Sequence, residues 1–77
     1  MSFGKFETTI VPSQLGETFP VDTHVVFKIH EHLQTGIITK QLKNSAVVEL
    51  DETLENQELV VQSNGMVIVN YKHLKKI

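Results

Sequence analysis

The 77-residue chain contains no cysteine, no tryptophan and no arginine, and only two prolines. Without cysteine it can have no disulfide framework, no thiolate nucleophile and no cysteine-ligated zinc site. Without arginine it lacks the side chain that forms paired hydrogen bonds with phosphate groups and guanine edges. Its longest apolar runs, such as Met66 to Val69, are too short to cross a bilayer. These absences disfavour a disulfide-rich secreted protein, a membrane-spanning protein and an arginine-based nucleic-acid binder.

The composition that remains is typical of one small globular domain. Hydrophobic residues make up 40% of the chain and charged residues 21%, with a net charge of −2. The charge is unevenly distributed, because residues 49–58 hold five acidic side chains while residues 59–77 hold three lysines and no acid. No apolar leader follows Met1, so the sequence predicts a cytoplasmic location.

Residues 1–20 are predicted to be an N-terminal arm or an extra edge strand, and residues 21–77 the main domain. Residues 3–11 read as one strand, after which Pro12, Gly16 and Pro20 indicate a loop.

Three further strands are predicted in the first half of the main domain. Residues 24–30 alternate apolar and polar side chains, and after a polar break at residues 31–34 a second strand covers residues 35–41. Gly36 in that strand suits a bulge or a close approach of backbone. A turn at residues 43–45 precedes the third strand, residues 46–50. The core is expected to contain Val25, Phe27, Ile29, Ile38, Ala46, Val48, Leu50 and Leu74.

Residues 51–57 read as an acidic solvated loop, with a short helical turn as the alternative. Asn64-Gly65 then predicts a two-residue hairpin turn between strands at residues 59–63 and 66–70, because both residues tolerate positive φ.

Both faces of this predicted hairpin are apolar. We expect Leu59, Val61, Met66 and Ile68 to face inward, which leaves an outer contact surface of Val60, Val67 and Val69. A covering strand at residues 6–11, a second copy of the protein or an unidentified partner are the alternatives for what covers that surface.

The C-terminal segment predicts one tight helical turn at residues 71–74, with Leu74 and Ile77 turned to the core. It also carries the best nucleic-acid feature of the chain, since an aromatic ring among lysines can stack on a base while the lysines contact phosphate. The candidate binding residues are Tyr71, Lys72, Lys75 and Lys76. The alternative is that Tyr71 packs on the domain and the lysines are solvated.

No catalytic, metal or cofactor site is predicted. His24, His30 and His32 alternate along one strand face, but a zinc site needs three or four convergent ligands and we expect exposed histidines instead. The serines occupy no nucleophile elbow.

The order of strands resembles a known family. Its motifs are Val25-x-Phe27-Lys28, Thr35-Gly36-x-Ile38, Asn44-Ser45-x-Val47-Val48-x-Leu50 and Val69-Asn70-x-Lys72-x-Leu74-Lys75-x-Ile77. Residues 24–77 are similar in this pattern to the YkvS-like family of small Gram-positive bacterial proteins, a domain of unknown function. The stretch from Val21-Asp22 to Gly36-x-Ile38 more loosely resembles KOW-type SH3-like barrels, which bind RNA or transcription and ribosomal proteins. These resemblances imply a conserved module without an assigned activity.

The sequence therefore predicts an all-β fold, a small SH3-like barrel of about five antiparallel strands with one short helical turn before the last strand. We expect a non-catalytic binding module that mediates a protein–protein contact, monomeric rather than homodimeric. The alternative function is a nucleic-acid or ribosome-associated module that uses the C-terminal lysines. No cofactor and no membrane partner are expected.

Overall fold

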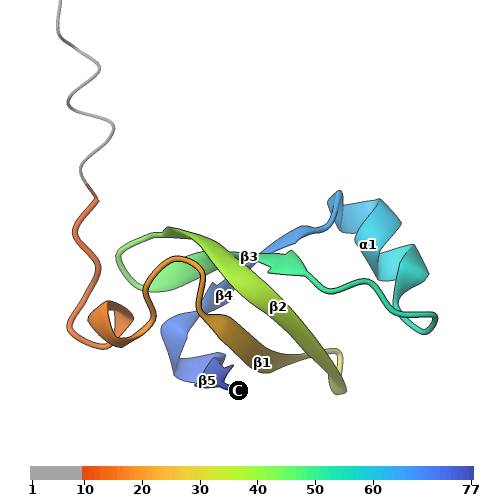
Figure 1. The fold of residues 1–77 in the computed structure, drawn as a ribbon, viewed down its shortest axis with the longest axis horizontal. Helices are drawn as coiled ribbons and strands as arrows, with labels where there is room; N and C mark the ends of the chain where they lie inside the picture. Colours follow the sequence, from red (N-terminus) through yellow and green to blue (C-terminus); the bar gives the residue numbers. More distant parts are fainter. Residues whose placement is uncertain (1–9) are drawn as a thin grey trace, which may run out of the picture.

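A computed structural model describes residues 10–77 as one five-stranded sheet with a short helix beside it (Figure 1). All strand pairs are antiparallel, and the order across the sheet is β4-β3-β2-β1-β5. The strands are β1 (His24–Ile29), β2 (His32–Gln41), β3 (Ser45–Leu50), β4 (Met66–Asn70) and β5 (Lys75–Lys76). The helices are α1 (Gln57–Ser63) and the 3-10 turns η2 (Gly16–Thr18) and η3 (Tyr71–His73).

The prediction of an all-β fold with a helical turn before the last strand is confirmed. In residues 10–77 the sheet is open, since β4 pairs only with β3 and β5 only with β1. It must nevertheless curl. Five flat strands would place β4 about 19 Å from β5, whereas the link from Asn70 to Lys75 spans about 17 Å even when extended. Part of that link is wound into η3, so its reach is shorter still.

The β1–β2 hairpin has a shorter turn than predicted. Ile29 pairs with His32, which leaves His30 and Glu31 as the only turn residues. Both adopt positive φ, 51° and 68°, as a tight hairpin turn requires, although neither is glycine or asparagine. The predicted break at residues 31–34 is therefore wrong beyond Glu31, and β2 begins three residues before its predicted start.

The pairing of β2 with β3 confirms the expected role of Gly36. A Cβ at Gly36 would lie 2.6 Å from Val48 Cγ1 and would also collide with the Glu49 carbonyl oxygen. The bulge of β2 is not at Gly36, because the register of the β2–β3 pairing shifts between Ile38 and Lys40. The backbones of the two strands therefore approach closely only because position 36 has no side chain.

The core lies on the inner face of the curled sheet, largely as predicted. Its buried members are Phe19, Val25, Phe27, Ile38, Ala46, Val48, Leu50, Tyr71 and Leu74, with Ile29 partly buried against them. The prediction that Ile77 turns to the core is wrong, because this side chain is 68% exposed.

The segment before β1 is held more firmly than a loose arm. The ring of Phe19 stacks on Tyr71 with 5.9 Å between centroids. The Gln41 side-chain amide donates hydrogen bonds to the carbonyl oxygens of Gly16 and Phe19, both at 3.0 Å. The predicted strand at residues 3–11 lies mostly outside the described residues, as does the proposed covering strand. Ile10 and Val11 are described and belong to no strand.

The predicted hairpin at Asn64-Gly65 is wrong, because residues 57–63 form helix α1. Asn64 and Gly65 do adopt positive φ, 57° and 78°, but they end a helix rather than join two strands. The Gly65 N–H donates to the Val60 carbonyl at 2.8 Å, a bond typical of helix C-caps. The Gly65 carbonyl then accepts from the Leu50 N–H at 2.7 Å, and this bond starts the pairing of β4 with β3.

The predicted faces of this region are wrong except at Leu59, which is partly buried against the core as expected. Val60, Val67 and Val69 are partly buried against the core. Val61, Met66 and Ile68 are 76%, 42% and 66% exposed. In β4 the faces alternate with period two, so an error in its pairing exchanges the inner and outer side chains of the whole strand.

Replacing Gly65 with valine is expected to lower the free energy of unfolding by about 1–3 kcal/mol. The reason is backbone strain at φ 78°, because a Cβ there would approach only Val60 Cγ1, at 4.0 Å. Gly65→Asn is the control and should retain most of the stability, since asparagine tolerates this conformation. Equal urea midpoints for the valine variant and the parent protein would contradict the assigned helix cap.

Candidate functional site

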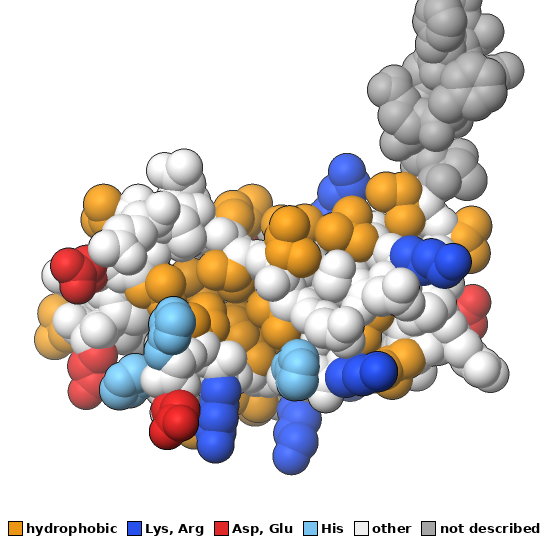
Figure 2. Space-filling view, turned by 180° about the vertical axis from the view of Figure 1, so that it is seen from behind, with side chains coloured by type: hydrophobic (Ala, Val, Ile, Leu, Met, Phe, Trp, Pro, Cys, Tyr) orange, Lys and Arg blue, Asp and Glu red, His pale blue; other side chains and the backbone are white. Residues whose placement is uncertain are grey.

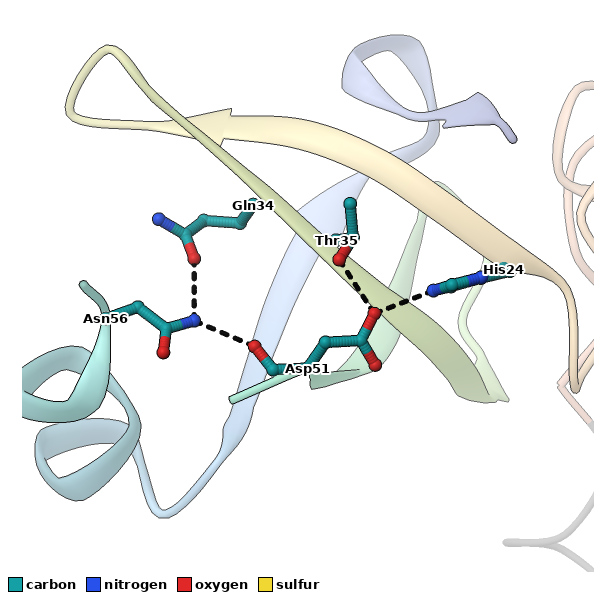
Figure 3. Close-up of polar contacts among 5 residues, drawn as sticks. All are labelled: His24, Gln34, Thr35, Asp51 and Asn56. Carbon is teal, nitrogen blue, oxygen red and sulfur yellow. Dashed lines mark hydrogen bonds and ion pairs between the residues drawn. The ribbon is translucent and has the colours of Figure 1, made fainter. Parts of the chain in front are cut away.

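Asp51 holds the start of the acidic loop against the sheet (Figure 3). Its Oδ2 lies 2.7 Å from His24 Nε2 and accepts a hydrogen bond from the Thr35 hydroxyl, also at 2.7 Å. The Asp51 N–H donates to the Thr35 carbonyl at 2.9 Å. The carboxylate thus stands between the hydroxyl and the imidazole. These contacts hold the loop in place. Because the imidazole contacts the carboxylate and not the hydroxyl, it is not placed to accept the proton of the Thr35 hydroxyl.

Asn56 fixes the other end of the loop. Its side-chain amide donates to Gln34 Oε1 at 2.9 Å and to the Asp51 carbonyl at 2.8 Å, while its Oδ1 accepts from the Thr53 N–H at 2.7 Å (Figure 3). Asn56 is 5% exposed, the only buried polar side chain among residues 10–77. The loop therefore has a defined shape, in which Asp51 contacts the sheet while Glu52 and Glu55 are exposed to solvent.

The hydrogen bonds to His24 and Thr35 hold the pKa of Asp51 below its ordinary value of 3.8. A lowered pKa means that the ionised form stabilises the fold above pH 4, and that this stability is lost as pH falls through the lowered pKa. We expect Asp51→Asn to be less stable than the parent by under about 1 kcal/mol at pH 7, since both partners are substantially exposed. The two proteins should converge near pH 2. Unfolding curves that keep a constant gap from pH 7 to pH 2 would contradict this assignment.

A groove of about 300 Å³ lies between the β1–β2 hairpin and the C-terminal segment. We call it the lysine groove, and it is lined by Val26, Phe27, Lys28, Leu33, Lys72, His73 and Lys75. Among residues 10–77 no acidic residue lines it. The register explains its composition, because Val26 pairs with Lys75 and Lys28 with Leu33. The groove thus combines an apolar floor with a basic rim.

A larger hollow of about 760 Å³ lies between the same hairpin and helix α1. We call it the acidic hollow. Its charged lining residues are Glu31, Asp51, Glu55 and Glu58, with His30 and His32, and its apolar ones are Ile29, Leu33 and Leu59. Within residues 10–77 no group of three histidine or acidic side chains is close enough together to hold a metal ion.

Leu33 belongs to both cavities, so the lysine groove and the acidic hollow meet at this side chain. It is 67% exposed although it is an aliphatic residue within a strand. Figure 2 shows a broad hydrophobic area on this side of the molecule, with acidic side chains mainly toward one end and lysines along its lower edge and toward the other end. Such a surface is suited to contact with another macromolecule.

The structure divides the predicted lysine-tail residues. Lys72 and Lys75 line the lysine groove, whereas Lys76 Nζ lies 5.7 Å from the centre of the Phe19 ring, outside it. Tyr71 is 1% exposed and its hydroxyl donates to the Leu42 carbonyl at 2.7 Å. Burial raises the pKa of this hydroxyl. Tyr71 therefore packs in the core, which was the alternative interpretation of this residue, and its ring is not available to stack on a base.

Val60, Val67 and Val69, the predicted outer contact surface, face the core instead of a partner. The residues that sequence reasoning missed are Val26, Lys28 and Leu33. The alternation of β1 places Val26 and Lys28 together on the outer face, which is a usable signal. No such signal marks Leu33, because the sequence pattern places this residue in the polar break between two strands.

No family model, no characterised protein and no solved structure matches the chain. The resemblances to the YkvS-like family and to KOW-type barrels therefore stay predictions. Among residues 10–77 no helix is long and apolar enough to span a membrane.

Proposed function

We propose that the chain is a non-catalytic binding module that mediates a protein–protein contact through the surface around Leu33. The observation that carries this proposal is the exposed Leu33 side chain at the junction of two cavities that are each lined by both apolar and charged residues. Protein interfaces combine a central apolar area with a polar rim in this way.

The alternative is a nucleic-acid or ribosome-associated module, and the lysine groove is the feature that favours it. Two observations favour protein over nucleic acid. The only tyrosine is buried, and the ring of Phe27 is 3% exposed, so neither can serve as a platform for base stacking. Acidic residues line the adjoining hollow, where they would repel a phosphate backbone.

We also infer that the curled sheet is an SH3-like small barrel and that the protein acts in the cytoplasm. The pairing of β5 with β1 and the turn η3 just before β5 support the barrel, since together they bring the two edges of the sheet toward each other.

Site-specific photocrosslinking in cells tests the proposed function. A photoreactive amino acid at position 33 should give crosslinked protein adducts that survive nuclease treatment. The same amino acid at position 61 is the control, because Val61 is similarly accessible but lines neither cavity. Adducts from position 33 that disappear with nuclease would support the nucleic-acid alternative. Equal yields from both positions would contradict a contact centred on Leu33.

A further inference from the structure

The charges around Leu33 are arranged in two opposite halves. Lys28, Lys72 and Lys75 lie on the groove side, and Glu31, Glu55 and Glu58 on the hollow side. All six side chains are exposed, and none of them forms an ion pair with another residue of the described chain. Each half is therefore free to pair with a surface of opposite charge.

A surface with a basic half, an acidic half and an apolar centre complements itself. Rotation by 180° about an axis through the centre sets the basic half of one copy against the acidic half of the other, and does so twice. Leu33 lies at this centre, because both cavities include it. From these observations we propose that two copies of the chain associate about a two-fold axis near Leu33. This inference rests on the proposed function and names its partner as a second copy.

The size of the surface agrees with such a contact. Of the 20 residues that line the lysine groove and the acidic hollow, all but Phe27 and Asn56 are at least partly exposed, close to the lower end of the roughly 20–30 residues that one partner contributes to an interface of standard size. A central aliphatic side chain surrounded by charges also matches the usual anatomy of interfaces, with an apolar core and a polar rim.

The turn of the β1–β2 hairpin contributes to this surface. His30 and Glu31 occupy left-handed backbone conformations that glycine or asparagine would adopt at lower cost. With these two residues the turn adds an imidazole and a carboxylate to the lining of the acidic hollow, whereas glycine would add no side chain. Unusual backbone conformations of this kind are concentrated at functional sites.

Paired charge reversals test the proposal with the full chain. Variant one carries Lys72→Glu and Lys75→Glu, so that both halves become acidic. Variant two carries Glu31→Lys, Glu55→Lys and Glu58→Lys, which leaves Asp51 as the one acidic residue of the hollow, so that both halves become basic. The parent protein should reach twice the monomer molar mass in light scattering at high concentration. Each variant alone should stay monomeric, and an equimolar mixture of the two should recover the doubled mass.

The matched control is Lys40→Glu with Lys43→Glu. It makes the same charge change as variant one at two exposed lysines that line neither cavity, and it should dimerise as the parent does. Leu33→Asp should abolish dimerisation without unfolding the protein, because it places like charges across the two-fold axis. Raising the salt concentration from 0.1 to 1 M should weaken the dimer, because the screening length falls from about 10 Å to about 3 Å.

Two outcomes would overturn the proposal. A parent protein that remains monomeric up to millimolar concentration excludes the dimer, and a mixture of the two variants that stays monomeric excludes this pairing of charges. If the parent is monomeric but position 33 still crosslinks to a different protein, the dimer is excluded while the proposed function stands. Nuclease-sensitive crosslinks from a monomeric protein would exclude both.

Discussion

Replacing Phe27 with alanine is expected to lower the free energy of unfolding by about 3–5 kcal/mol. The Phe27 ring is 3% exposed at the centre of β1, where it contacts the core formed by β2 and β3. A domain of this length has a total stability on the order of 5 kcal/mol. We therefore expect the variant to be largely unfolded at 37 °C, with circular dichroism showing loss of the sheet signal.

Val26→Ala is the matched control for this experiment. Val26 is the neighbour of Phe27 in the same strand, but it lies on the opposite face of the strand and is only half-buried. Its truncation should cost about 1 kcal/mol and leave the fold intact. A larger loss for Val26→Ala than for Phe27→Ala would mean that β1 presents the opposite face to the core.

Replacing Gly36 with alanine is expected to cost about 1–3 kcal/mol, the range for forcing extra atoms into a packed site. A methyl group at this position collides with the Glu49 carbonyl, and that carbonyl is part of the β3 backbone. It cannot move aside without separating β2 from β3, whose pairing joins Gly36 to Leu50 and Ile37 to Glu49. Thermal unfolding of the variant measures the effect.

Ile37→Ala provides the comparison, because Ile37 is adjacent, on the opposite face and 38% exposed. It should lower stability by less than Gly36→Ala, even though it removes more atoms than the glycine variant adds. A Gly36→Ala variant with unchanged melting temperature would show that β2 and β3 leave room for a methyl group between them.

Period-two alternation predicted the centre of the sheet correctly. In β1 and β3 the apolar residues recur at every second position, and one face of each strand is buried. The close approach at Gly36 was also predictable, since a glycine inside a strand pattern often marks a place where another backbone comes near. The position of Leu74 in the core followed from its place after a tight helical turn.

Helix α1 was not predictable from local sequence. Leu59, Val60 and Val61 favour a strand by propensity, and Asn64-Gly65 serves a hairpin turn and a helix C-cap equally well because both need positive φ. Tertiary contacts decide between them. As a helix, this segment packs Leu59 and Val60 against the core while Val61 and Gln62 face solvent.

The candidate site was predicted only in part. Lys72 and Lys75 were singled out from their charge, but Lys28 and Leu33 lie more than 35 positions earlier in the sequence. They meet because β5 returns to pair with β1 beside the β1–β2 hairpin. No local pattern contains that long-range pairing, so the groove became visible only with the fold.

The pairing of β5 with β1 also has a consequence for the order in which the molecule opens. Strands β1 to β4 each pair with their neighbour in the chain, whereas β5 must return across about 50 residues and is only two residues long. Its ladder has few bonds to lose, so the C-terminal end should open separately, well below the free energy of global unfolding. In native-state hydrogen exchange, the amides of Lys76 and Ile77 should exchange long before those of β2 and β3. Each such opening also removes the Lys75 side of the lysine groove, so the groove is complete only while this last strand is docked.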